Sequence, residues 1–430
     1  MNLSFYFSSS LIRNILSGVI LLNIFFLFGT WLHNSLLLTN TWYVIPRLVA
    51  ILNLAAENNA AAWYSSMLLF VVAIAALFCF INDFQNLKRF QDRILSLGWI
   101  ILTMIFIVLS FDEMGSFHEI IGETALFKKM GSSHGAGWYA FYALIAMVVI
   151  FMMLFSFLKF KNNKKAFFFA ALGATLFVSN PFQEIYEIHS WENSADPDNW
   201  RRPIFFMILE EGSEIFASFC FLKAFILYAL NPKGEHALDI ANKGFRIEII
   251  IKNLFVYFLT FAVLVGLLMV VVKFNAWQME GDDGIAHNWF PSSMSFLVAL
   301  MSSYLYFLSR DKMPSYKITL LLFTFFSLFM SFFYGSNMYA AWEMPLNKIP
   351  FIFLLTTVIL GGLALFKLQS RIAKLGLTAG IACAIISYYT KDFKTAMFGY
   401  LAASLFLIAL LSYYQYLAAG LKKNSIINSH

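Results

Sequence analysis

Nine of the chain's 24 carboxylates lie in or beside apolar stretches, where they form three short motifs. The first motif, SFDEMGSFHEIIGE at residues 110–123, directly follows the apolar run GWIILTMIFIVL. The second is NPFQEIYEIH at residues 180–189, and the third is LEEGSEIF at residues 209–216. A carboxylate inside a membrane is costly unless it is paired, protonated or hydrated, so acids in such segments indicate a functional site.

The spacing of these acids places several of them on common helix faces. Asp112, Glu119 and Glu123 are seven and four residues apart, and Glu210 and Glu214 are separated by one turn. Carboxylates from neighbouring helices, joined by a histidine, form the di-iron and di-manganese sites of helical bundles. The Glu-x-x-His pair of those sites does not occur in these segments.

The motifs therefore predict a shared polar site, for which three interpretations stay open. It could hold a divalent metal (iron, manganese or zinc), bind a proton or monovalent cation, or form a structural hydrogen-bonded network. The predicted metal ligands are Asp112, His118, Glu119, Glu123, Glu184, Glu187, His189, Glu210 and Glu214. The predicted general acid–base residues are Glu113 and Glu211.

A basic pair, Arg201 and Arg202, lies between the second and third motifs. Arginine can hold a phosphate or carboxylate through two parallel hydrogen bonds, so the pair could bind an anionic substrate beside the acids. The alternative is that the two arginines neutralise nearby acids, Glu192, Asp196 and Asp198, or contact lipid headgroups.

The composition identifies the elements that must position these residues as membrane-spanning helices. Of 430 residues, 60% are hydrophobic and 13% are charged, whereas soluble domains are about half apolar and one quarter charged. The net charge of +6 comes from basic residues between apolar runs, so no nucleic-acid partner is expected. Cys79, Cys220 and Cys383 lie inside apolar runs without CxxC spacing, which predicts packing roles.

Apolar runs predict an all-α polytopic bundle of about twelve spans. They fall near 11–32, 62–82, 95–112, 137–158, 166–186, 204–230, 249–272, 292–309, 318–336, 350–367, 375–390 and 395–418. Alternate connections are rich in Lys and Arg, which places them, and both termini, in the cytoplasm. All three acidic motifs then lie toward the outer face of a bacterial inner membrane. The predicted organisation is a six-helix unit over 1–230, a cytoplasmic linker over 231–248 and a second six-helix unit over 249–430 that lacks the acids.

The two predicted units share faint sequence similarity. AAWYSSMLLF opens the second span and HNWFPSSMSFL opens the eighth, while SFDEMGS has a weaker counterpart in SFFYGSN. A duplicated six-helix unit would explain both matches. The alternative is chance similarity among the Trp, Phe and Ser residues that are common at membrane interfaces.

Over about the first 230 residues, the chain resembles a family of uncharacterised prokaryotic multi-pass membrane proteins. The resemblance rests on LNLAAENNAAAWYSSMLLF, SFDEMGSFHE and LEEGSEIF, in that order. It implies that the acids and the histidine of the second and third of these stretches belong to the family's motif, and it implies no activity.

Three functions remain open from the sequence. The first is a divalent-metal-dependent membrane enzyme that acts on a lipid or lipid-linked anionic substrate. The second is a proton- or cation-coupled secondary transporter. Twelve spans arranged as two sets of six are typical of that class. The third is a membrane scaffold or assembly partner. The position of the acids toward one end of their helices favours the enzyme, since transporter sites lie near the membrane midplane.

Overall fold

The computed structural model divides the chain into two compact units, residues 2–250 and residues 251–430. It describes residues 2–7, 9–39, 49–56, 59–86, 94–115, 136–193, 202–230, 245–250, 284–308, 314–335 and 371–389, together with residues 406 and 410. These residues are almost entirely helical, as the sequence predicts for a membrane bundle.

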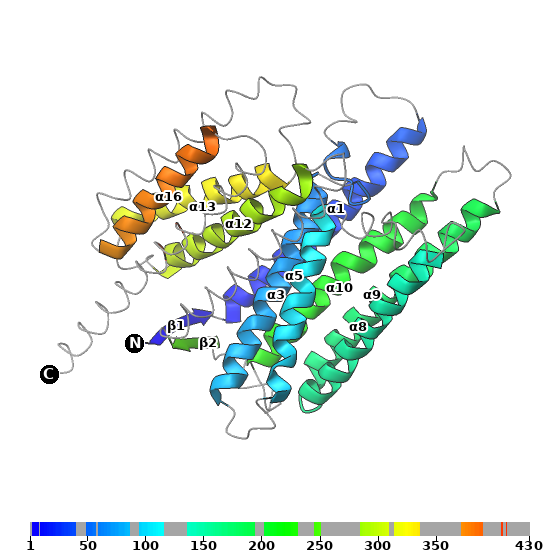
Figure 1. Ribbon diagram of the computed structural model, residues 1–430, viewed down its shortest axis with the longest axis horizontal. Coiled ribbons are helices and arrows are strands. Elements are labelled where there is room, and N and C mark those ends of the chain that lie inside the picture. The colour runs from blue at the N-terminus through cyan, green and yellow to red at the C-terminus, as the bar shows by residue number, and fades with distance from the viewer. Residues whose placement is uncertain are drawn as a thin grey trace. The chain divides into compact units, whose positions relative to one another are not determined.

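The described residues of the first unit form six long helices and two short strands, which Figure 1 labels. In chain order they are β1 (Asn2–Phe7), α1 (Ser9–Thr39), α3 (Ala60–Asn86), α5 (Gly98–Gly115), α8 (Ala136–Phe160), α9 (Lys164–Glu192), α10 (Ile204–Leu230) and β2 (Phe245–Ile250). The second unit contributes α12 (Gly284–Leu308), α13 (Pro314–Gly335) and α16 (Arg371–Tyr389).

Five helical stretches of the described residues are long and apolar enough to cross a membrane, and all five lie in the first unit. They are Ser9–Leu36, Ala60–Phe84, Ile94–Met114, Lys164–Gln183 and Ile204–Leu230. Shorter apolar stretches occur at Ala146–Phe160 and Leu320–Phe332. The chain is therefore a polytopic membrane protein. The predicted spans at 249–272, 350–367 and 395–418 lie outside the described residues, apart from 406 and 410 and the first residues of 249–272.

Contacts between the helices show which of their ends lie together. Ser66, early in α3, bonds to Ser110, late in α5, so these two helices are antiparallel. Cys79, late in α3, contacts the Phe225 carbonyl late in α10, so α3 and α10 run in the same direction. The end where α5 finishes and α10 begins is called the Glu210 end below, and the opposite end is called the Asp83 end.

Asparagines cap two of the helices that form this bundle. Asn59 Oδ1 accepts hydrogen bonds from the backbone N–H groups of Ala61 and Ala62 at 2.8 and 2.9 Å, which satisfies donors at the start of α3. Asn163 Oδ1 does the same for Ala166 at 3.1 Å at the start of α9. Asn163 also donates to the Leu227 carbonyl, which fixes the start of α9 against the end of α10.

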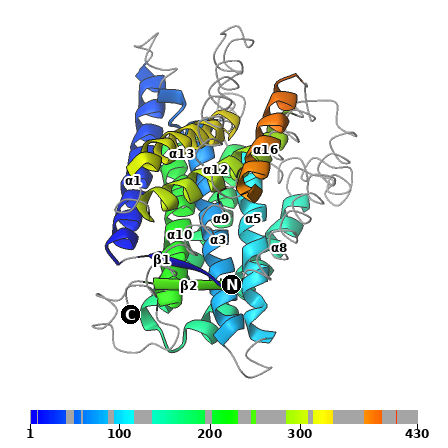
Figure 2. The same cartoon turned by 90° about the vertical axis from the view of Figure 1, so that its left-hand side faces the viewer.

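The two strands are the exception to the helical fold. β1 and β2 pair antiparallel, from Asn2 opposite Ile250 to Phe7 opposite Phe245. Figure 2 shows the pair at the end of the first unit where α1 begins. The strand FRIEII therefore crosses the predicted boundary between the linker over 231–248 and the span from residue 249. It pairs with the N-terminal segment, so the helix predicted from residue 249 does not begin there.

An aromatic core packs the Asp83 end of the first unit. Trp99 is fully buried, and its ring centroid lies 5.0–5.7 Å from those of Phe155, Phe160, Phe225 and Tyr228. These rings come from α5, α8 and α10, so one side chain joins three helices. Large apolar side chains of α8 and α9 are instead exposed on the outer surface, as expected for helices in contact with lipid.

Each unit contains a hairpin joined by a serine pair. In the first, Ser66 Oγ donates to the Ser110 carbonyl at 2.5 Å, and the two hydroxyl oxygens are 3.1 Å apart. In the second, Ser292 Oγ donates to the Ser331 carbonyl at 2.7 Å, with the hydroxyl oxygens 3.2 Å apart. Ser66 and Ser292 each stand three residues after a tryptophan, in the two stretches whose sequences match.

Candidate functional site

The third acidic motif meets the second through a hydrogen-bonded contact between α9 and α10. Asn180 Nδ2 donates to Glu214 Oε1 at 2.8 Å. Ser213 Oγ contacts Asn180 Oδ1 and lies 2.7 Å from the Glu210 carbonyl oxygen, so its single proton serves one of the two. Asn180 and Ser213 are both buried. The amide of α9 is thus held at both its oxygen and its nitrogen by α10.

This contact lies close to the middle of both helices, although the apolar stretch of α9 that is long enough to cross a membrane ends at Gln183, three residues after Asn180. α9 covers 29 residues and is centred on residue 178, two residues from Asn180. α10 covers 27 residues and is centred on residue 217, three residues from Glu214. At about 1.5 Å per residue, both side chains start within about 5 Å of their helix midpoints. Glu214 therefore starts nearer the middle of its helix than Glu210 does, and the position of the acids toward the outer face stays a prediction.

A proline inside α9 directly follows Asn180. Pro181 has no backbone N–H, so the carbonyl of Phe177 one turn earlier loses its usual helical partner. Such a break leaves a backbone oxygen on α9 within one turn of the Asn180–Glu214 contact. Polar backbone of this kind is tolerated at membrane depth where it is buried in protein or faces a cavity.

Gln183 lies on α9 one turn from Asn180, toward the Glu210 end, and its amide oxygen is buried. Gln183 Nε2 donates to Ser179 Oγ at 3.2 Å. Gln183 Oε1 is buried and accepts no hydrogen bond from any described residue. Gln183 and Asn180 are three residues apart and so share a face of α9. The structure therefore holds an acceptor oxygen in the protein interior beside the contact.

Glu210 forms an ion pair with Arg202, which lies just before the start of α10. Arg202 retains 26% side-chain exposure and Glu210 retains 12%, so the pair lies at the margin of the buried region. Arg202 thus pairs with an acid of the third motif, and the substrate-binding and neutralising roles predicted for it both stay predictions.

The other predicted site residues fall into two groups. Asp112 and Glu113 are half-buried at the last turn of α5, at the same end of the unit as Glu210 and Glu211. The side chains of Glu184, Glu187 and His189, in the second half of α9, lie outside the description. His118, Glu119, Glu123 and Arg201 lie outside the described residues altogether.

No group of three or more His, Cys, Asp or Glu side chains is positioned to hold a metal ion within the described part of the chain. Six of the nine predicted ligands have side chains outside that part. The divalent metal therefore stays a prediction.

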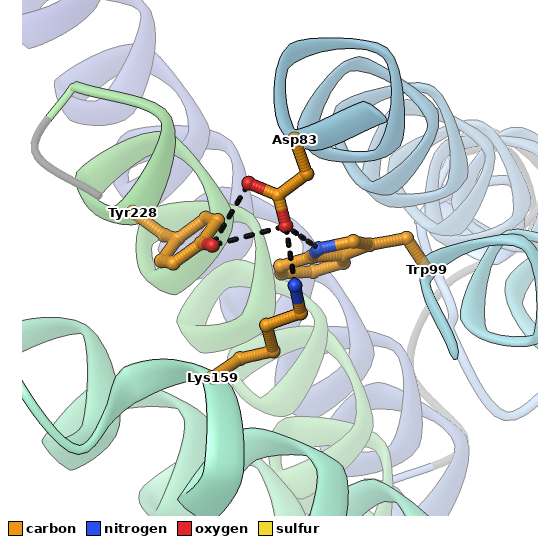
Figure 3. Close-up of polar contacts among 4 residues, drawn as sticks. All are labelled: Asp83, Trp99, Lys159 and Tyr228. Carbon is orange, nitrogen blue, oxygen red and sulfur yellow. Dashed lines mark hydrogen bonds and ion pairs between the residues drawn. The ribbon is translucent and has the colours of Figure 1, made fainter. Parts of the chain in front are cut away.

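A second buried carboxylate, which sequence reasoning missed, lies at the Asp83 end (Figure 3). Asp83 pairs with Lys159 at 2.7 Å and accepts hydrogen bonds from the Trp99 indole and the Tyr228 hydroxyl. Asp83 falls in the connection between the predicted spans at 62–82 and 95–112, which is one of the connections rich in Lys and Arg. The signal that could have revealed this buried carboxylate is its position, as a single acid between the end of an apolar run and the basic residues.

A search against known proteins identifies the family of this chain. A family model described as a domain of unknown function (DUF8692) matches residues 14–229, half of the chain. The chain belongs to this family, and the match covers the helices from α1 to α10. No curated protein and no solved structure matches the chain.

Proposed function

We propose that this member of the DUF8692 family is a proton- or cation-coupled secondary transporter, and that Asn180 and Glu214 form its coupling site. The observation that carries the proposal is the buried contact between Asn180 and Glu214, which places the Glu214 carboxylate within three residues of the midpoint of α10. Binding sites of secondary transporters lie near the membrane midplane, in helices interrupted by Gly or Pro. Pro181 provides such an interruption beside Asn180.

The chemistry of the contact suits a small cation. Glu214 can change its protonation state, and Asn180 and Gln183 contribute amide groups that do not titrate. Oxygen ligands of this kind are those that hard cations prefer. A proton on Glu214 or a monovalent ion shared among these oxygens would bind at the place where α9 and α10 are joined, so binding would alter the packing of the two helices.

The serine-paired hairpins support the duplicated architecture that many transporters have. α3–α5 and α12–α13 carry the same hydrogen-bonded arrangement in stretches whose sequences match. We propose that the chain comprises two six-helix repeats, twelve spans in all, in the inner membrane with both termini in the cytoplasm. In this arrangement only the first repeat carries the acids.

The experiment uses the full chain in proteoliposomes with a pH-sensitive dye inside. Pools of amino acids, sugars, organic acids and inorganic ions are added outside, with and without sodium. The proposal expects that at least one pool produces a proton flux or a sodium-dependent uptake in the wild type, and that Glu214→Gln lacks it. Uptake that proceeds identically in Glu214→Gln would overturn the coupling role.

A second candidate, a divalent-metal-dependent enzyme, is favoured by one observation. The buried Gln183 Oε1 accepts no hydrogen bond from a described residue and lies on the helix that carries Glu184 and Glu187. A buried oxygen acceptor without a donor suits a bound metal ion. In this account iron, manganese or zinc is held by the predicted acids and histidines, Glu113 or Glu211 serves as base, and Arg201 contacts a lipid-linked anionic substrate.

Metal analysis separates the two candidates. Protein purified in mild detergent without added metal is measured by mass spectrometry beside the Glu210→Ala/Glu214→Ala variant. Stoichiometric transition metal that is lost in a folded variant would establish the metal site and favour the enzyme. A folded wild type without metal, even after incubation with iron, manganese or zinc, favours the transporter.

A further inference from the structure

The Asp83 carboxylate joins four helices of the first unit. Its Oδ2 lies 2.7 Å from Lys159 Nζ on α8 and 2.9 Å from Trp99 Nε1 on α5. The Tyr228 hydroxyl on α10 lies 2.9 Å from Oδ1 and 3.0 Å from Oδ2. Figure 3 shows the three donors converging on the acid from different ribbons. No contact of the Glu210 end takes part in this arrangement.

The Asp83–Lys159 ion pair is buried among aromatic rings. The Lys159 and Asp83 side chains are 6% and 4% exposed, among the rings that surround Trp99. Removing two charges from water is costly, and well-packed apolar side chains often stabilise a buried site as well as an ion pair does. An ion pair differs in that it defines one arrangement of its partners and resists others.

The helix that carries Lys159 is held to the core through this region. Phe155 and Phe160 of α8 pack on the Trp99 ring, on either side of Lys159 in sequence. Other α8 side chains face outward, including Met147, Ile150, Leu154 and Phe157. The Asp83–Lys159 pair adds an ionic contact to these ring contacts at the end of α8 that meets α3 and α5.

A buried cysteine lies directly beneath the pair. Cys79 precedes Asp83 by one turn of α3, and its side chain has no exposed surface. Its thiol contacts the Phe225 carbonyl of α10 at 3.4 Å. Solvent that enters between α8 and α10 at the Asp83 end would reach Cys79 before it reaches the middle of the unit.

We infer that the Asp83–Lys159 pair is a latch that holds α8 against α3 and α10 and keeps the Asp83 end of the bundle closed. Breaking the pair lets α8 move outward and opens a path for water toward Cys79. The inference goes beyond the proposed function and requires no transported substrate, so it can be tested separately.

The test measures how fast N-ethylmaleimide labels Cys79 in full-length, detergent-purified protein that carries Cys220→Ala and Cys383→Ala. With the latch intact, labelling is slow because Cys79 is buried. Lys159→Met and Asp83→Asn are each expected to raise the labelling rate by about tenfold or more, since local opening limits the reaction. Lys161→Met is the matched control, because Lys161 is exposed two residues further on, and it should label at the wild-type rate.

Cys220 distinguishes opening of one end from general unfolding. It is buried in α10, just over two turns from Tyr228 on the side away from the latch. With Cys79→Ala and Cys383→Ala as background, Cys220 should stay unlabelled in Asp83→Asn. Equal labelling of Cys79 in wild type, Lys159→Met and Asp83→Asn would overturn the inference, as would parallel exposure of Cys79 and Cys220. If Lys159→Met does not fold, the Asp83→Asn result decides.

Discussion

Asn180 and Glu214 are joined by a 2.8 Å hydrogen bond, although they belong to motifs separated by the predicted outer loop between two spans. Both lie within three residues of the midpoint of their helix. The bond fixes how α9 and α10 are aligned with each other. Toward the Glu210 end, the same alignment brings Tyr186 and Phe206 together, with their ring centroids 5.0 Å apart. In this alignment the backbone of residue 184 is level with that of residue 210 along the two helix axes.

Arg202→Gln should destabilise the protein by leaving the Glu210 carboxylate without its ion-pair partner. Because Arg202 is about a quarter exposed, we expect a loss of about 1–3 kcal/mol in the free energy of unfolding, below the cost of breaking a fully buried pair. The free energy is measured by denaturant titration in detergent. Glu210→Gln in the same chain should recover part of the loss. Fully additive effects of the two substitutions would contradict a direct pair.

Ser66→Ala and Ser292→Ala should have similar effects on stability if the two hairpins are copies of one unit. Each removes one hydrogen bond between neighbouring helices, for which a loss of about 0.5–1 kcal/mol is expected. Thr175→Ala is the control, because the exposed Thr175 hydroxyl bonds only within its own helix among the described contacts. A measurable cost at Ser66 with none at Ser292 would argue against equivalent hairpins.

Gly98→Ala should push α8 away from α5. A methyl group at residue 98 would overlap the Phe155 ring, so we expect a loss of about 1–3 kcal/mol in stability. Phe155→Leu in the same chain should relieve the overlap and recover part of the loss. Gly18→Ala is the control, since a methyl group there meets no described atom within 4 Å and improves helix propensity. Equal losses at both glycines would exclude the steric explanation.

The helices of the first unit could be predicted closely because their signal is local. The predicted span at 204–230 coincides with α10, and that at 137–158 lies within two residues of α8 at each end. Apolar length alone determines such segments in a membrane. The acids at 210 and 214 were found for the same reason, since they interrupt an apolar run.

Contacts between segments could not be predicted in this way. Asn180 belongs to the second acidic motif, but its bond to Glu214 depends on how α9 and α10 pack. Asp83 was assigned to a basic loop, whereas α3 continues to Asn86 and carries the acid into the aromatic core. The β1–β2 pair joins segments more than two hundred residues apart, and FRIEII was divided between the cytoplasmic linker and the start of a span.

The most direct measurement is the thermal stability of the purified protein as a function of sodium concentration and pH, for the wild type and for Glu214→Gln. A cation that binds the folded state at a hundred times its dissociation constant adds about 2.7 kcal/mol of stability. Sodium, or a fall in pH, is expected to raise the melting temperature of the wild type, and this dependence should be lost in a folded Glu214→Gln. The same dependence in both proteins would place cation binding elsewhere and contradict the account.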